Sequence, residues 1–246
     1  MINIVIPMAG AGSRFKEAGY IKPKPFIDVA GKPMIIHVLE NLNLPNANFI
    51  LVAQREHAIA ESVLFDYIKE KFNAEFVLID SMTEGAACTI LHASKFISND
   101  KPLLIGNSDQ LVDFDLLKFV KDSENRNLDG SILIFRDKNR DAKWSFVKTN
   151  MDGFAELVLE KEPISDMATV GIYFFRRGFE FVDAAVEMIT NGRKIKGEYY
   201  IAPTYNLLIE QKKKIGIFEI DQKLMHGLGT PDDLKLFLAL INNDVS

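Results

Sequence analysis

Apolar positions in the first half of the chain form short unbroken runs, separated by longer segments in which they recur with helical spacing. The runs predict buried strands at residues 2–7, 49–53, 75–79 and 102–106. The segments between them predict helices at residues 33–42, 56–72 and about 85–96. In the segment 56–72 the spacing is carried by Ile59, Val63, Tyr67 and Ile68. Strands and helices in strict alternation are typical of βαβ units, which indicate a parallel sheet.

The second half of the chain shows a different pattern. Strand-like runs occupy residues 130–136, 145–149, 154–160, 169–175 and 215–220, and helical spacing returns at about 178–190, at 203–212 and after Pro231. There is no linker rich in Pro, Gly or Ser and no internal repeat. We therefore predict one α/β domain over residues 1–246, with a Rossmann-like mixed, mostly parallel sheet flanked by helices.

Composition narrows the class of protein. The 246 residues carry a formal net charge of −5, which gives no electrostatic footprint for nucleic acid. The single cysteine, Cys88, cannot form an internal disulfide and fits a reducing compartment. The chain shows no signal-peptide pattern and no apolar run of the length that a membrane span needs. We expect a cytoplasmic protein without a membrane or nucleic-acid partner.

A glycine-rich segment follows the first expected strand directly. It consists of Met8, Ala9, Gly10, Ala11, Gly12 and Ser13. Glycines let backbone N–H groups approach a phosphate chain closely, because they have no Cβ. Arg14 and Lys24 could supply positive charge, and Lys24 lies on a segment stiffened by the prolines on either side of it. This combination points to a nucleoside triphosphate.

Two familiar glycine motifs do not fit. The dinucleotide fingerprint requires a third glycine, and Phe15 stands at that position. A P-loop requires Lys-Ser or Lys-Thr immediately after its second glycine, and Ser13 and Arg14 follow here instead. Neither a NAD site nor a P-loop is therefore expected.

The remaining pattern is G-x-G-S-R, about ten residues, and P-K-P. It resembles the N-terminal signature of the sugar-phosphate nucleotidylyltransferases, also called nucleotide-sugar pyrophosphorylases. The resemblance implies a nucleotide-diphospho-sugar transferase-like fold, with a nucleotide-binding half at 1–115 and an acceptor-binding half at 116–246. It implies nucleotidyl transfer from an NTP to a sugar 1-phosphate, giving a nucleotide sugar and pyrophosphate. Lys24 would contact the α-phosphate or the incoming phosphate, and Arg14 would hold the leaving pyrophosphate.

A carboxylate follows the expected strand at 102–106. Ligands of open parallel sheets bind beyond the carboxyl ends of strands, so Asp109 faces the expected crevice. By resemblance, Asp109 is the ligand of an Mg²⁺ cofactor, and it forms the catalytic set with Lys24 and Arg14. The family's second metal ligand is an aspartate, which Gly227 replaces here. Asp221 is our candidate for a substitute.

Further resemblances assign residues that would contact the nucleobase and the acceptor. The turn containing Thr83, Gly85 and Ala86 resembles the base-reading turn, although the glutamine of many family members is missing, and Gln54 could read a base edge instead. The acceptor-binding residues by resemblance are Glu160, Lys161, Gly171 and Glu198. Trp144 is expected to be an ordinary buried side chain.

Three other activities remain open at this stage. A close variant is cytidylyl transfer to a non-sugar phosphate such as phosphocholine or an alditol phosphate. A metal-dependent glycosyltransferase would use a D-x-D motif, which Asp113 and Asp115 formally provide. A regulator that binds nucleotides without catalysis is suggested by Gly227. The sequence names neither the base nor the acceptor, and a homo-oligomer stays an option.

Overall fold

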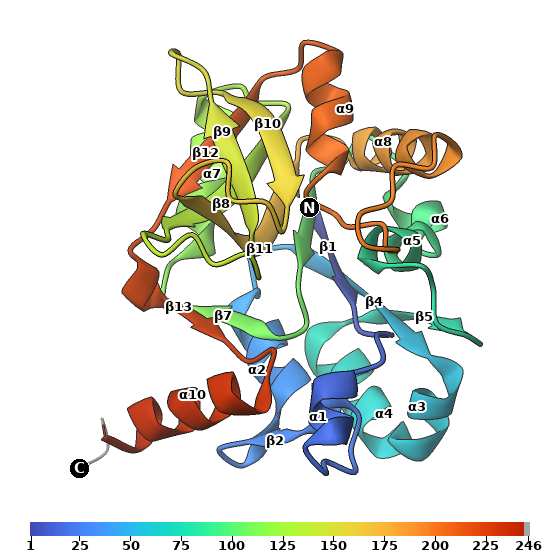
Figure 1. The fold of residues 1–246 in the computed structure, drawn as a ribbon. Helices are drawn as coiled ribbons and strands as arrows, with labels where there is room; N and C mark the ends of the chain where they lie inside the picture. Colours follow the sequence, from blue (N-terminus) through green and yellow to red (C-terminus); the bar gives the residue numbers. More distant parts are fainter. Residues whose placement is uncertain (244–246) are drawn as a thin grey trace.

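The computed structural model describes residues 1–243 and contains a nine-stranded mixed sheet in the middle of the molecule (Figure 1). The nucleotide-binding half forms a parallel part with the strand order β6–β1–β4–β5. These strands are β1 (Ile2–Pro7), β4 (Ala47–Gln54), β5 (Glu75–Ile79) and β6 (Leu103–Gly106). All four were predicted from their apolar runs.

The second half of the chain extends the same sheet. Strand β11 pairs antiparallel with β6, and β8 joins β11 to β12, while β9 and β10 form an antiparallel hairpin at one edge. Their bounds are β8 (Gly130–Arg136), β9 (Ser145–Thr149), β10 (Ala155–Glu160), β11 (Met167–Phe175) and β12 (Ile215–Glu219). The predicted α/β class with a mixed sheet flanked by helices is confirmed.

Helices cover both faces of the sheet, because alternate residues of each strand point to opposite sides. Ile4 and Ile6 of β1 belong to one apolar cluster and Val5 to the other. The first cluster includes side chains of α2 (Met34–Asn41), α4 (Ser62–Phe72), α7 (Leu116–Asn125) and α10 (Pro231–Asn243). The second includes side chains of α5 (Ala86–Leu91), α6 (Ser94–Ile97), α8 (Gly178–Thr190) and α9 (Thr204–Glu210). Within residues 1–243, no helix has the length and apolar character that crossing a membrane would need.

Short elements near the expected site escaped prediction. The helix α1 (Ser13–Glu17) follows the glycine-rich segment, and Lys24 opens the 3₁₀ turn η1 (Lys24–Phe26). Two small ladders stand apart from the main sheet. They join β2 (Asp28–Val29) to β3 (Lys32–Pro33) and β7 (Gln110–Val112) to β13 (Met225–Gly227), which follows the turn η2 (Gln222–Leu224).

The predicted helix at 56–72 is wrong in two respects. The chain forms α3 (Arg55–Ala60) and then α4, with a break at Glu61. Three of the four residues that carried the predicted spacing are exposed, since the exposed fraction is 75% for Ile59, 84% for Val63 and 45% for Tyr67. The buried face of α4 is formed by Phe65, Ile68 and Phe72.

Candidate active site

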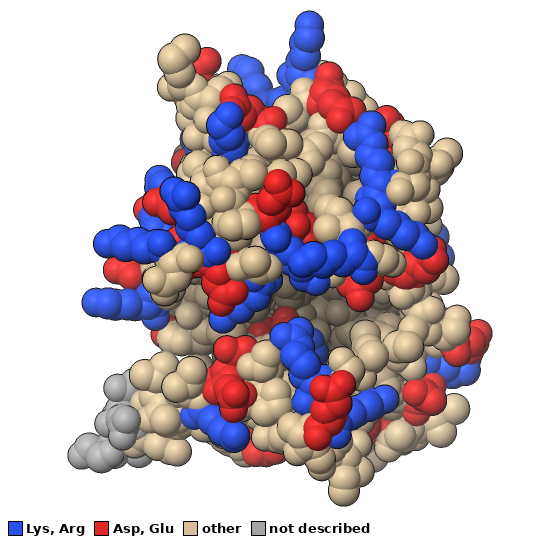
Figure 2. Space-filling view, viewed as in Figure 1, with Lys and Arg blue, Asp and Glu red and all other residues tan. Residues whose placement is uncertain are grey.

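A cavity of about 450 Å³ opens beyond the carboxyl end of β6 and extends to β9, β10 and β11. Figure 2 shows basic and acidic side chains gathered around a hollow on this face. The polar or charged residues at its wall are Arg14, Asn107, Asp109, Gln110, Lys143, Ser145, Glu160, Lys161, Thr169, Glu198, Thr230 and Asp233. Arg14 and Asp109 therefore share one cavity with the predicted acceptor residues.

A smaller cavity of about 80 Å³ lies at the glycine-rich segment. It is lined by Pro7, Met8, Gly10, Gly12, Lys24, Pro25 and Ser108. Gly12 has φ +59°, and a Cβ on it would come within 3.3 Å of the Lys24 Cβ. The glycine therefore permits both the left-handed turn and the close packing of the Lys24 segment. Phe15 is buried in the core, which explains why the third glycine of a dinucleotide motif is absent here.

Lys24 and Asp109 meet directly. The Lys24 Nζ atom lies 2.7 Å from Asp109 Oδ2, and both side chains are about one-fifth exposed. Lys24 lines the smaller cavity and Asp109 the larger one, so the ion pair stands where the two cavities meet. The structure thus brings together the three residues predicted to be catalytic, on one side of the molecule.

Of the residues predicted to contact the base, only some line a cavity. Ala86 lines the large cavity, but Thr83 donates its hydroxyl hydrogen bond to the Gly85 carbonyl at 3.0 Å. Gln54 donates from Nε2 to the Ala9 carbonyl at 2.7 Å, which ties the end of β4 to the glycine-rich segment. Met8 and Ala9 are buried, whereas Gly10, Ala11 and Ser13 are exposed.

The local backbone explains why residue 85 is a glycine. Its φ is +127°, and a Cβ would lie 2.4 Å from the backbone oxygen of Tyr199. Tyr199 in turn donates its N–H to the Glu84 carbonyl at 2.7 Å and accepts from the Ala87 N–H at 3.1 Å. This contact accounts for a glycine at position 85 without a nucleobase, and the base contact stays a prediction.

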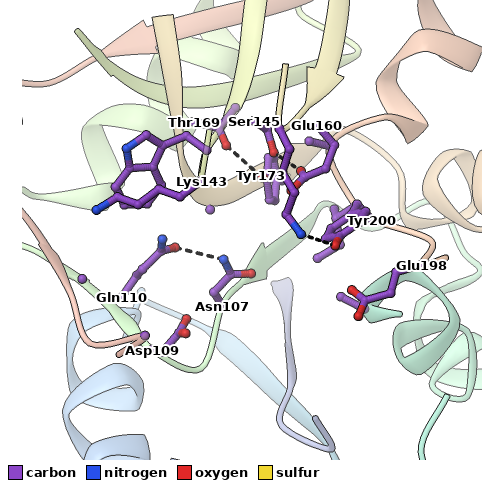
Figure 3. A pocket seen from close by; sticks show the side chains of 18 of the residues that line it. Asn107, Asp109, Gln110, Lys143, Ser145, Glu160, Thr169, Tyr173, Glu198 and Tyr200 are labelled. Atoms are coloured by element: carbon purple, nitrogen blue, oxygen red, sulfur yellow. Dashed lines mark hydrogen bonds between the residues drawn. The ribbon is translucent and has the colours of Figure 1, made fainter. Parts of the chain in front are cut away.

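Glu160 is the buried carboxylate of the acceptor side (Figure 3). Burial raises the pKa of Glu160, and a hydrogen bond donated by the Ser145 hydroxyl opposes that rise. Lys161 has φ +57° and donates to the Tyr200 hydroxyl, with its ammonium 4.6 Å from the ring centroid. Glu198 lines the same wall. Carboxylates, hydroxyls and an ammonium together suit an acceptor with hydroxyl and phosphate groups.

Gly171 makes room for an amide pair that the sequence reading missed. Its φ is +92°, and a Cβ would overlap the Gln110 Oε1 atom at 1.9 Å and the Asn107 Nδ2 atom at 2.4 Å. Asn107 donates to Gln110 across 3.0 Å, and both side chains face the cavity (Figure 3). Asn107 directly follows β6. The strand-end rule that pointed to Asp109 could therefore have pointed to Asn107 as well.

Aromatic residues also line the cavity. Tyr173 is buried and its hydroxyl lies 3.1 Å from that of Thr169. Burial raises the pKa of Tyr173, because the phenolate would lose its hydration there. Trp144, expected to be buried, is half-exposed and lines the cavity, with its ring edge-on to Phe135.

Asp221, the candidate for a second metal ligand, has another hydrogen-bond partner. Asp221 accepts from the Lys223 N–H at the start of η2, and it precedes β13. The register pairs Met225 with Val112 and Gly227 with Gln110, so Asp221 lies at the opposite end of this ladder from Asp109. The structure therefore does not bring Asp221 to the cavity.

The two aspartates of the D-x-D motif, Asp113 and Asp115, also have partners within the chain. Asp113 Oδ2 lies 2.7 Å from His226 Nε2, and Asp115 caps α7 by accepting from the Leu117 N–H. A cap and a histidine contact occupy both carboxylates, which disfavours the glycosyltransferase reading. Within residues 1–243, no group of three or more His, Cys, Asp or Glu side chains forms a metal cluster.

The chain has an α/β fold with a cavity lined by charged residues at the carboxyl end of β6. The chain belongs to the nucleotidyl transferase family, which it matches over residues 4–234. This confirms the resemblance seen in its N-terminal signature.

Two relatives of this chain cover it almost completely. It is 26% identical to the bifunctional protein GlmU of Methanocaldococcus jannaschii over 99% of this chain and 56% of that protein. It is 24% identical to the UTP–glucose-1-phosphate uridylyltransferase AglF of Haloferax volcanii, over 94% of this chain and 93% of that protein. The chain thus spans about half the length of the first relative and nearly all of the second.

Solved structures agree with the fold. The nucleoside-diphosphate-sugar pyrophosphorylase of Vibrio cholerae RC9 superposes with a TM-score of 0.82 at 25% identity, covering 96% of this chain and 99% of that one. A UDP-glucose pyrophosphorylase complexed with UDP-glucose superposes with a TM-score of 0.80 at 16% identity, over 99% and 100%. The second likeness concerns the fold alone.

Proposed function

We propose that this protein transfers a nucleotidyl group from an NTP to a sugar 1-phosphate, releasing pyrophosphate and a nucleotide sugar. The observation that carries the proposal is the Lys24–Asp109 pair, which stands between the glycine-rich segment and the acceptor cavity. Membership of the nucleotidyl transferase family and the names of its relatives support the same activity. Free Cys88 fits a cytoplasmic site of action.

The proposed reaction needs positioning more than it needs a base. An oxygen of the acceptor phosphate attacks the α-phosphorus of the NTP and forms the new P–O bond. The bond from the α-phosphorus to the oxygen bridging to the β-phosphate breaks, and its electron pair leaves with pyrophosphate. Because the attacking phosphate is already anionic, no residue has to remove a proton from it.

The charged residues act on the anion that develops during this displacement. The Lys24 ammonium neutralises charge on the α-phosphoryl oxygens, and its proline-flanked segment limits the reorganisation that this requires. Arg14, at the wall of the large cavity, holds the leaving pyrophosphate. Gly10 and Gly12 let backbone N–H groups approach the phosphate chain.

The residues present fit a magnesium ion. Asp109 offers a hard oxygen ligand, and a Cβ on Gly229 would come within 3.0 Å of its Oδ2 atom, so a glycine at 229 leaves more room beside that oxygen. When bound, Mg²⁺ polarises phosphoryl oxygens as a Lewis acid. Glu160, Lys161, Gly171 and Glu198 form the acceptor site, in which the lysine pairs with phosphate and the carboxylates accept from hydroxyl groups.

A pyrophosphate-release screen of the four NTPs against phosphorylated sugars and alcohols tests the proposal and identifies base and acceptor together. With the active pair, Lys24→Met is expected to lower kcat by about 10²–10³-fold, because it removes a donor to the transition state. Lys22→Met is the matched control, since Lys22 is 58% exposed and pairs with Glu61. Wild-type enzyme that releases no pyrophosphate with any pair, or an unchanged kcat in Lys24→Met, would refute the assignment.

A further inference from the structure

Position 227 lacks the carboxylate that the family motif places there, and another carboxylate lies close to it. Gly227 lies in β13 directly opposite Gln110, the residue after Asp109. The Leu228 N–H donates to the Asp109 carbonyl at 2.7 Å, which fixes this segment against the metal-binding candidate. A Cβ built on Gly227 meets the Asp233 Cγ atom at 3.9 Å, and no other atom is as near.

Asp233 reaches this place from another element. It lies in the first turn of α10, next to the cavity that Asp109 also lines. Thr230 donates its hydroxyl hydrogen bond to Asp233 Oδ2 at 2.6 Å, and the Asp233 N–H donates back to the Thr230 hydroxyl at 3.1 Å. This reciprocal pair orients the carboxylate, and the helix N-terminus favours its negative charge.

We propose that Asp233 supplies the second carboxylate of the magnesium site, in place of the aspartate that Gly227 has replaced. The inference rests on the proposed function. The Asp233 Cγ atom lies 3.9 Å from the place of a Cβ on residue 227, so the carboxylate of Asp233 lies beside the place of the missing one. One carboxylate suffices there, because magnesium takes its remaining ligands from phosphates and water.

The other nearby carboxylates do not fit this role. Asp221 lies beyond the far end of the β7–β13 ladder, and Asp113 contacts His226. Asp232 is 88% exposed and pairs with Lys235. Glu160 and Glu198 line parts of the cavity away from Asp109 (Figure 3).

Manganese binding measured by electron paramagnetic resonance, without nucleotide or acceptor, tests the proposal directly. Asp233→Asn and Asp109→Asn are each expected to weaken Mn²⁺ binding by about tenfold or more. Asparagine keeps an acceptor for Thr230, so the cap at the start of α10 is retained, and urea unfolding checks this. Asp232→Asn and Asp221→Asn are the matched controls, for which binding stays at the wild-type level.

A rescue variant separates metal binding from helix capping. Gly227 has no positive φ and space for a side chain, so Gly227→Asp is compatible with the backbone. Combined with Asp233→Asn, it is expected to restore Mn²⁺ binding, which a purely capping role of Asp233 does not explain. Wild-type binding by Asp233→Asn, or a folded double variant that binds no better than Asp233→Asn, would overturn the proposal. Metal binding that follows this pattern in a protein releasing no pyrophosphate would refute the proposed transferase activity alone.

Discussion

At the scale of single residues, Glu160 is a buried carboxylate whose ionisation affects the stability of the fold. It is 9% exposed, and burial raises the pKa of its carboxyl group above the ordinary value of 4.5. The folded chain therefore keeps this proton at pH values where the unfolded chain has lost it. The stability from this group is fully present below about pH 4.5 and is lost as the pH rises through the folded-state pKa.

Replacing Glu160 with glutamine should remove this pH dependence, because an amide does not ionise. The free energy of unfolding of Glu160→Gln, relative to wild type, is expected to increase from pH 4 to pH 7. Urea unfolding at several pH values measures it, with Glu156→Gln as the control, since Glu156 is exposed on the same strand. A difference that does not change with pH would mean that Glu160 ionises as easily in the folded chain as in water.

The sequence predicted the centre of the site better than its walls. Lys24 and Asp109 are 85 positions apart in sequence, yet the stiff P-K-P segment and the strand-end rule pointed to both. Asn107 follows β6 directly, where the strand-end rule applies, but its pairing with Gln110 could not be predicted, because Gly171 on another strand makes the space for it. A contact between two segments that are distant in the sequence produces no spacing pattern in either segment, so it cannot be predicted from periodicity.

At the scale of elements, the start of α5 is held by a segment more than 100 positions away in the sequence. Tyr199 donates to the Glu84 carbonyl and accepts from the Ala87 N–H, and Gly85 lies between them against the Tyr199 backbone. The base contact expected for Gly85 stays a prediction. The Tyr199 contact could not be predicted from the sequence, because main-chain atoms of any residue make the same contact.

Gly85→Ala should disrupt the contact between the start of α5 and the Tyr199 segment. Alanine at φ +127° is strained, and its Cβ would lie 2.4 Å from a backbone oxygen, so we expect destabilisation by roughly 1–3 kcal/mol or more. Gly197→Ala is the control, because that glycine also has a positive φ, +87°, but no atom within 4 Å of an added Cβ. Urea unfolding compares the two variants. Equal losses would show that backbone strain alone, without the Tyr199 contact, explains the cost.

The helices α3 and α4 show how spacing can mislead. Ile59 and Val63 recur with the period of a helix, yet the core selected Phe65 and Phe72, whose rings bury more apolar surface. Both sets have helical spacing, so the pattern predicted a helix correctly and its buried face wrongly. Burial is decided by the sheet that the helix packs on.

At the scale of the whole molecule, one sheet crosses the boundary near residue 115. Strand β11 pairs with β6 through Ile172–Gly106 and Tyr173–Ile105, which joins the two halves by backbone hydrogen bonds. Both apolar clusters also contain residues from the two halves. We therefore propose that residues 1–246 unfold as one cooperative unit rather than as a nucleotide-binding and an acceptor-binding domain.

The chain offers a direct test, because its only tryptophan, Trp144, lies in the acceptor half. Phe49 is buried on β4, in the other half, and Phe49→Ala is expected to cost about 3–5 kcal/mol through lost burial and a residual cavity. If the sheet unfolds as a unit, tryptophan fluorescence and far-UV circular dichroism report coincident urea transitions, and Phe49→Ala shifts both equally. A fluorescence midpoint that stays at the wild-type value while the dichroism midpoint falls would divide the chain into two domains, because the tryptophan would then report a half that folds without β4.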